Sequence, residues 1–262
     1  MSLAFGRVPR GAVRAAFNES GVSGEWILPT GNAPARTILY LHGGGYVACS
    51  PAQYRSLTGA LALRCNARVL ALDYPLAPEH PFPAAVDAAL NCYRWLLASR
   101  TPASQIVVGG DSAGGGLSLS FLLAARENGL DLPAGAVLLS PWVDLTGTAE
   151  SIRSNAPSDD VVVDDGSHSL ARMYAGKEAL DDPRISGVFA DLRELPPMLI
   201  QASNIEMLRD DAVKLAENAR SAGVDVALHL FDGVPHVWQL WNIPESREAF
   251  GEIARFVERV TT

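Results

Sequence analysis

Residues 105–117 read QIVVGGDSAGGGL, and this stretch decides how the rest of the chain is interpreted. An apolar run rich in β-branched residues, Gln105–Gly109, leads into the glycines, and a stretch with helically spaced apolar residues, Ala113–Asn128, follows them. We expect the helix to end there because Gly129 comes next, and glycine readily adopts the conformation that closes a helix. The segment predicts a buried strand, a tight turn at Ser112 and a helix.

The same alternation of strand and helix continues in both directions. Five other runs are mostly apolar, as is typical of strands buried on both faces of a parallel sheet. They are Thr37–Leu41, Arg68–Leu72, Ala134–Leu139, Met198–Ala202 and Val226–Phe231. Helical patterns at Ala84–Ser99 and Ala212–Ala222 lie between them. This order favours an α/β fold with a doubly wound, mostly parallel sheet flanked by helices.

The composition is that of one globular domain with an acidic surface. The chain has 262 residues, of which 48% are hydrophobic and 19% charged, and its net charge is −8. Such a charge offers no electrostatic footprint for nucleic acid or for an anionic membrane surface. No apolar run reaches the roughly 18–20 residues that span a bilayer. We therefore expect neither nucleic acid nor a membrane as a partner.

The cysteines and the N-terminal residues indicate in which cellular compartment the protein is expected. Cys49, Cys65 and Cys92 form no CxxC motif and no cluster at metal-ligand spacing. A sparse, odd set of cysteines favours reduced thiols rather than a disulfide framework. The first seventeen residues contain basic side chains but no apolar core of a signal peptide. These features predict a cytoplasmic protein without a metal site.

One long segment breaks the alternation of strands and helices. Residues 144–197 contain several turn-forming residues, a modest helix at Ser167–Ala175 and no convincing core strand. Eleven acidic against five basic side chains between Asp144 and Leu195 account for six of the eight net negative charges. The segment is too long for a plain loop in a compact domain. We expect a single domain, 1–262, with a small cap formed by this insertion and by about residues 1–24.

The turn at Ser112 has the sequence expected of a catalytic nucleophile. Gly110–Gly114 matches the pattern G-x-S-x-G in the strand–turn–helix setting that a nucleophile elbow requires. The hydroxyl of Ser112 would project above the sheet, beside a helix N-terminus that favours developing negative charge. The alternative interpretation is a glycine-rich turn with a serine that caps the helix.

A second glycine motif is the stronger signal. His42-Gly43-Gly44-Gly45 has a chance expectation of about 0.003 in this composition, against about 0.15 for the serine motif. It follows a buried strand, at the sheet edge where open α/β sheets bind ligands. Backbone N–H groups there can face a substrate oxygen, and acyl transfer needs such donors. We expect an oxyanion hole from the N–H groups of Gly44, Gly45 and Ala113; the alternative is a merely flexible turn.

A base for Ser112 is expected in a loop after a late strand, and one of five histidines fits. His236 follows the run Val226–Phe231 in the loop Asp232–His236. The others lie in the glycine turn, which His42 would orient, in a proline-rich segment (His80), in the acidic insertion (His168) and within a strand (His229). The sequence therefore predicts His236 as the base.

A serine–histidine pair of this kind needs a third residue, an acid that orients the histidine. It should lie between the run Met198–Ala202 and His236. Glu206, Asp210 and Asp211 are the candidates. Glu206 is nearest the strand end and lies in the loop, whereas the two aspartates open the next helix, where acidic residues commonly complement the helix dipole. We expect Glu206 as the acid, in the chain order Ser…Glu…His of α/β-hydrolases.

With these residues in place, the chain resembles the bacterial hormone-sensitive-lipase-like esterases over essentially its whole length. Six motifs carry the resemblance: YLHGGGY (40–46), DYPLAPEHPFPAA (73–85), GDSAGGG (110–116), SPWVDLT (140–146), ADLRELPPMLIQAS (190–203) and GVPHVW (233–238). The resemblance implies the α/β-hydrolase fold, no cofactor, a helical cap built from the N-terminus and the insertion after the sixth strand, and a possible homodimer. The family's acid falls on Glu206.

The chain departs from this family at three points. Pro75 stands where the family usually has arginine, and Ser203 stands where a glycine usually opens the acid loop. The arm before the HGGG motif is short, so we expect part of the usual cap to be absent.

Together these features predict a carboxylesterase that hydrolyses short- to medium-chain acyl esters through Ser112, His236 and Glu206. A related acyl hydrolase, namely an amidase, a lactonase or a deacetylase, is the alternative with the same triad. A non-catalytic ligand receptor is the alternative from another class. Plant gibberellin receptors resemble the family but lack the catalytic histidine, whereas His236 is present here.

Overall fold

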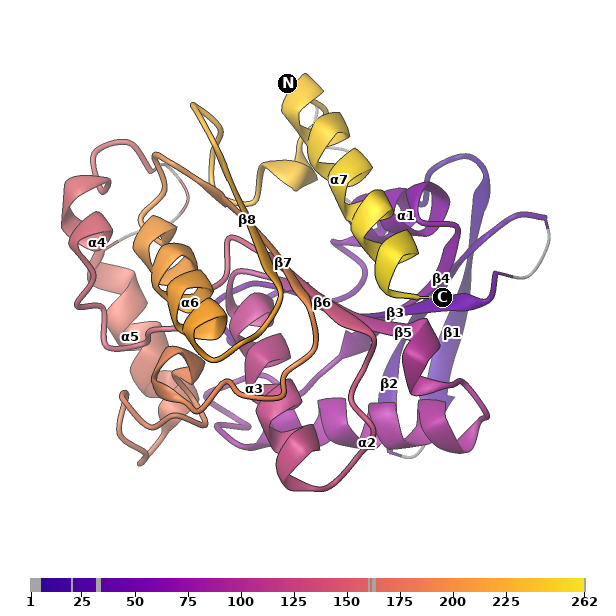
Figure 1. Ribbon diagram of the computed structural model, residues 1–262, viewed down its shortest axis with the longest axis horizontal. Coiled ribbons are helices and arrows are strands. Elements are labelled where there is room, and N and C mark those ends of the chain that lie inside the picture. Colours follow the sequence, from indigo (N-terminus) through magenta and orange to yellow (C-terminus); the bar gives the residue numbers. More distant parts are fainter. Residues whose placement is uncertain (1–5, 20, 32–33, 160, 162–163, 262) are drawn as a thin grey trace.

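The computed structural model describes residues 6–19, 21–31, 34–159, 161 and 164–261. Their strands form one sheet in the order β1-β2-β4-β3-β5-β6-β7-β8 (Figure 1). The strands are β1 (Ala12–Glu19), β2 (Val22–Pro29), β3 (Arg36–Leu41), β4 (Ala67–Asp73), β5 (Ile106–Asp111), β6 (Gly135–Leu139), β7 (Met198–Ser203) and β8 (Val226–Phe231). Pairing is parallel from β4 to β8 and antiparallel at β1–β2 and β2–β4.

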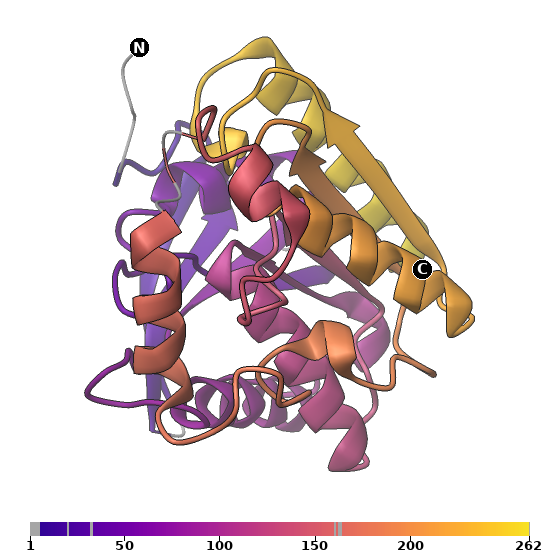
Figure 2. The same ribbon diagram turned by 90° about the vertical axis from the view of Figure 1, so that its left-hand side faces the viewer.

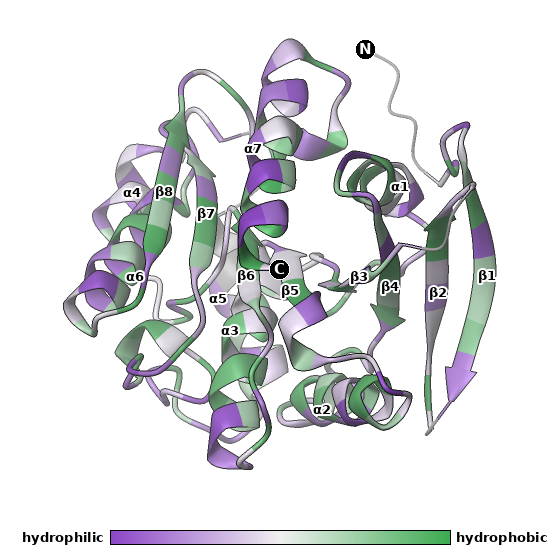
Figure 3. Ribbon diagram, turned by 45° about the vertical axis from the view of Figure 1, so that its right-hand side comes forward, coloured by the Kyte–Doolittle hydropathy of each residue, from purple (hydrophilic) through white to green (hydrophobic). Residues whose placement is uncertain are grey.

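Helices cover both faces of this sheet. They are α1 (Arg55–Arg64), α2 (Ala84–Ala98), α3 (Ala113–Glu127), α4 (Glu150–Ser154), α5 (Asp164–Ala175), α6 (Arg209–Ser221) and α7 (Pro244–Val260). On one face, α1 and α7 bury Leu57, Ile253 and Val257 against the strands, while α2, α3 and α6 share the larger core on the other. The middle of β4 is hydrophobic, whereas α7 alternates between hydrophilic and hydrophobic residues (Figure 3). This is the predicted doubly wound, mostly parallel architecture.

The first two strands correct an expectation. Residues 12–19 and 22–24, predicted to contribute to a cap, instead belong to an antiparallel hairpin at the sheet edge; residues 1–5 and 20 lie outside the described part. Most side chains of β1 are exposed, so the strand has no continuous apolar run that marks it in the sequence. Its buried residue, Phe17, packs edge-on against Trp26 and Trp95, which anchors the hairpin to α2.

The insertion at residues 144–197 contains α4, α5 and a 3₁₀ turn, η2 (Gly187–Phe189), and no strand among its described residues. Residues 160, 162 and 163 lie outside the description. The insertion runs along one side of the molecule, with α5 standing apart from α6 (Figure 2). Its side chains Ile152, Tyr174 and Ile185 are buried in the same core as α3. The insertion is therefore packed onto the fold rather than attached by a linker.

No helix in the described part of the chain is both long and apolar enough to cross a membrane.

Candidate active site

Ser112 occupies the turn between β5 and α3 in a backbone conformation that L-residues rarely adopt, with φ 52° and ψ −122°. Two hydrogen bonds hold this turn: Ser112 N donates to Leu139 O (2.8 Å), and Trp142 N donates to Ser112 O (2.9 Å). The helix packs so closely that a Cβ on Gly114 would collide with the carbonyl oxygen of Leu41. The glycine is required because strand and helix backbones meet there.

The glycine motif forms a turn directly after β3. Gly44 and Gly45 have φ values of +111° and +63°, which favour glycine. His42 is buried, its Nδ1 lies 2.8 Å from Gly43 O, and its ring stacks on Tyr74 with 4.4 Å between centroids. Burial lowers the pKa of His42 to about 4, so the ring is neutral at physiological pH. His42 thus supports the turn, as expected.

Asp111 joins the two turns, and sequence reasoning missed it. Its carboxylate accepts hydrogen bonds from Tyr40 Oη (2.7 Å), Tyr54 Oη (2.9 Å) and Gly43 N (3.1 Å). Burial raises the pKa of Asp111, and these hydrogen bonds counteract the rise. A carboxyl at the end of a fully buried strand requires such partners, and that was the available signal. Asp111 thereby fixes the glycine turn relative to Ser112.

Three backbone N–H groups in these two turns lack an acceptor in the described part of the chain. The N–H of Gly43 is taken by Asp111, but no described residue accepts a hydrogen bond from Gly44 N, Gly45 N or Ala113 N. Ala113 opens α3, where an N–H has no partner within the helix. These are the donors that the sequence predicted for an oxyanion hole.

The structure brings Glu206 and His236 together. His236 Nδ1 lies 2.6 Å from Glu206 Oε2, and the two residues are only 5% and 1% exposed. Burial alone would lower the pKa of His236, but the hydrogen bond and charge of Glu206, with the charges of Asp159 and Asp111, raise it above its ordinary value. Strands β5 to β8 run parallel, so Ser112, directly after β5, and His236, in the loop after β8, both lie at the carboxyl ends of the strands.

Ser203, the departure from the family pattern, strengthens this arrangement. Its N–H donates to Glu206 Oε1 (2.8 Å), and its hydroxyl donates to Val234 O (2.6 Å) in the loop that carries His236. On the other side of the histidine, Val237 N donates to Ser140 Oγ (3.2 Å). The loops of acid and base are thus tied to each other.

The two rival acids have other partners. Both lie in the first turn of α6, as predicted, but neither caps that helix. Asp210 accepts from Ser151 N (2.9 Å), and Asp211 accepts from Val143 N and Asp144 N (2.9 Å each). Burial raises the pKa of Asp211 to about 8, with the backbone donors counteracting the rise. The aspartates therefore hold the insertion and do not face the histidine.

Helix α5 of the insertion packs on the glycine turn. A Cβ on Gly45 would lie 2.8 Å from Leu170 Cδ1, and the ring of Tyr174 stacks on Tyr46 with 3.6 Å between centroids. An apolar side chain and an aromatic stack therefore cover this side of the candidate site.

Comparison with known proteins decides the family. Residues 38–240 match a family described as having the alpha/beta hydrolase fold. A crystal structure of an esterase from the bacterial hormone-sensitive lipase family is 42% identical, covers 98% of this chain and 87% of its own, and superposes with a TM-score of 0.95. The chain belongs to the bacterial hormone-sensitive lipase family of α/β-hydrolases.

Curated relatives of this α/β-hydrolase agree with the structural comparison. It is 40% identical to an acetyl-hydrolase of Streptomyces hygroscopicus, over 90% of this chain and 80% of that protein. It is 36% identical to an esterase of Acinetobacter venetianus, over 90% and 79% of the two chains. The predicted family and fold are confirmed, and the enzyme is a serine carboxylic ester hydrolase.

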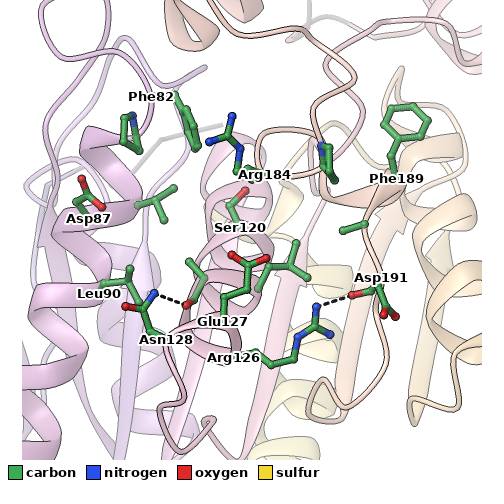
Figure 4. A pocket seen from close by; sticks show the side chains of 16 residues that line it. Phe82, Asp87, Leu90, Ser120, Arg126, Glu127, Asn128, Arg184, Phe189 and Asp191 are labelled. Atoms are coloured by element: carbon green, nitrogen blue, oxygen red, sulfur yellow. Dashed lines mark hydrogen bonds between the residues drawn. The ribbon is translucent and has the colours of Figure 1, made fainter.

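The hydrolase has another pocket that is not this site. It has a volume of about 340 Å³ and lies between α2, α3 and residues 183–191, with Phe82, Phe189 and Glu127 among its lining residues (Figure 4). Ser120, also in the lining, lies in α3 eight residues after Ser112, about 12 Å along the helix axis from the start of that helix. None of Ser112, Glu206 and His236 lines the pocket.

Proposed function

We propose that the enzyme is a carboxylesterase that hydrolyses short- to medium-chain acyl esters through Ser112, His236 and Glu206. The buried contact of 2.6 Å between Glu206 and His236 carries the proposal. The proposal is supported by the topology, because the pair follows β7 and β8, which run parallel to the strand that leads into Ser112 and its strained turn. A histidine oriented by a carboxylate and paired with such a serine is the constellation of acyl transfer.

The proposed reaction has two steps. Ser112 Oγ attacks the ester carbonyl while His236 Nε2 takes the serine proton, and Glu206 holds the opposite nitrogen and stabilises the imidazolium. The tetrahedral intermediate collapses, and His236 returns the proton to the departing alcohol. Water then attacks the acyl-enzyme with His236 again as base, which releases the acid and restores Ser112.

We assign the oxyanion hole to the N–H groups of Gly44, Gly45 and Ala113. Their lack of acceptors among the described residues supports this assignment. Donors aimed at the developing charge contribute about 2.7–4 kcal/mol each to lowering the barrier. The insertion, residues 144–197, would act as the cap, which the contact of Leu170 with Gly45 supports.

The substrate range is tested by a chain-length series of p-nitrophenyl esters. We expect the highest kcat/KM for acyl chains of about two to eight carbons, because each buried methylene gains about 0.8 kcal/mol only until the pocket ends. The insertion is acidic and rich in turn-forming residues, which does not favour docking on a lipid surface. Emulsified triolein is the control. A maximum at sixteen carbons, or activation at an oil–water interface, would make the enzyme a true lipase.

The same assay separates the related reactions. If the enzyme is an esterase, p-nitroanilides with the favoured acyl group should turn over far more slowly than the ester. Lactones of similar carbon number should also turn over far more slowly. Faster turnover of an amide or a lactone would instead favour that acyl hydrolase. A non-catalytic receptor would turn over none of them.

The pH profile tests the role of His236. The base must be neutral to take a proton, so kcat/KM should fall as pH drops through the pKa of His236. Glu206, Asp159 and Asp111 raise that pKa, so the midpoint of the acid limb should lie above 6.5, the ordinary histidine value. Tryptophan fluorescence across the same pH range controls for unfolding. An acid limb with its midpoint near pH 5 in a folded enzyme would exclude His236 as the base.

A further inference from the structure

The loop that carries Glu206 is held by a distant part of the chain. We call residues 204–207 the acid loop and residues 151–159, which include most of α4, the α4 segment. The two are about fifty residues apart in sequence and belong to different parts of the fold, because the acid loop follows β7 whereas the α4 segment belongs to the insertion.

Each of the four acid-loop residues has a backbone group bound by a side chain of the α4 segment. The hydrogen bonds are Asn155 Nδ2 to Asn204 O (3.1 Å) and to Glu206 O (2.9 Å), Ser158 Oγ to Ile205 O (2.9 Å), Ser151 Oγ to Met207 O (2.6 Å), and Met207 N to Asp159 Oδ2 (2.8 Å). The loop forms neither helix nor strand, so these side chains satisfy backbone groups that a regular element would pair.

We propose that Asn155 is a positioning residue that holds Glu206 in place for His236, so that the insertion supports the reaction as well as covering the site. The inference rests on the proposed triad. The amide of Asn155 places donors on two carbonyls, one of them that of Glu206 itself. The side chain of Glu206 is held as well, because its Oε1 accepts a hydrogen bond from Ser203 N. Carbonyl and carboxylate are thereby both fixed, which determines where Oε2 meets the imidazole.

The residue type at position 155 matters because both neighbours are acceptors. The side-chain amide of asparagine supplies two N–H donors, whereas an aspartate of nearly the same shape supplies none and carries a negative charge. Asn155→Asp therefore replaces two hydrogen bonds with repulsion between oxygens. Asn155→Ala removes the bonds without adding charge. A displacement of about 1 Å in a catalytic group can lower the rate by about 10²-fold, so the loss of this support should be measurable.

The experiment compares Asn155→Ala and Asn155→Asp with Arg153→Ala. Arg153 lies in α4, two residues before Asn155, which caps the end of that helix. Its side chain is exposed, and no described acid-loop residue contacts it by a hydrogen bond or ion pair. At the pH plateau with a p-nitrophenyl ester, we expect kcat to fall about tenfold in Asn155→Ala and further in Asn155→Asp, with KM changed less than about threefold. Arg153→Ala should match the wild type.

The pH profile separates positioning from mere stability. Three carboxylates raise the pKa of His236: Glu206 from the acid loop, Asp159 from the α4 segment and Asp111 from the end of β5. A looser Glu206 raises that pKa less, so the acid limb of kcat/KM should move to lower pH in Asn155→Ala. The aspartate variant is unsuitable for this readout because its new charge would itself raise the pKa.

The outcomes are distinct. Asn155→Ala with kcat within twofold of the wild type per folded molecule, or with an unmoved acid limb, would overturn the proposal. If Asn155→Ala does not fold, Ser158→Ala provides the test, because it removes the hydrogen bond to Ile205 O. We expect this variant to lower kcat about threefold at unchanged KM. An unchanged kcat would then overturn the proposal. Full activity in Glu206→Gln would instead defeat the proposed triad itself.

Discussion

Replacing Ser112 with alanine should lower kcat for a p-nitrophenyl ester by a factor of about 10⁴ to 10⁶. The residues of a catalytic triad act as a unit, so without the nucleophile the histidine and its carboxylate have no covalent step to assist. The substitution removes one hydroxyl from a turn whose hydrogen bonds to Leu139 and Trp142 involve only the backbone, so the fold should be retained. KM should change little, because the N–H donors of the glycine turn remain.

Ser120→Ala is the matched control for this change. Ser120 lies in α3, the helix that follows Ser112, and is only 2% exposed, but its hydroxyl has no hydrogen-bond partner among the described residues. Its substitution should leave kcat within about twofold. A serine-directed phosphonate should label the wild type and Ser120→Ala but not Ser112→Ala. Residual activity of Ser112→Ala within tenfold of the wild type would exclude Ser112 as the nucleophile.

The parallel part of the fold could be predicted because burial on both faces leaves a signature in the sequence. Strands β3 to β7 are buried and mostly apolar, and the half-buried edge strand β8 is mostly apolar too; the predicted ranges agree with the observed ones to within two residues. The edge strands β1 and β2 could not be found in this way. Their side chains are mostly exposed or half-buried, and antiparallel edge pairing imposes no apolar run.

The candidate site was predictable where the chemistry requires a residue type at a strand end. Ser112, Glu206 and His236 each follow a strand, and the last two meet as expected; their catalytic roles stay predictions. The residues that hold the site in place show no comparable pattern in the sequence. Asn155 and Asp111 act through side-chain contacts with segments some fifty to seventy residues away, and these contacts have no periodicity. The position of Asp111 at the end of a buried strand indicates that it needs partners, but only the folded chain reveals which partners these residues have.

Glu206→Gln should lower kcat by a factor of about 10³ to 10⁴ at the pH plateau. Glutamine can still accept the hydrogen bond from Ser203 N, so the loop should keep its geometry. Its NH₂ group, however, then faces His236 Nδ1, which must become an acceptor. The ring proton moves to Nε2, and that nitrogen can no longer take the proton of Ser112.

The pair Glu206→Gln and Asp210→Asn makes the comparison specific to the triad. Asp210 is an acidic side chain only four residues away, but its partners are Ser151 N and Arg209 rather than an imidazole. Asparagine keeps an oxygen for Ser151 N, so Asp210→Asn should retain kcat within about threefold. Steady-state kinetics of both variants, with folding checked by circular dichroism, provide the test. A crippled Asp210→Asn beside an active Glu206→Gln would identify Asp210 as the acid, and comparable intermediate losses at both positions would mean that the two carboxylates share the role.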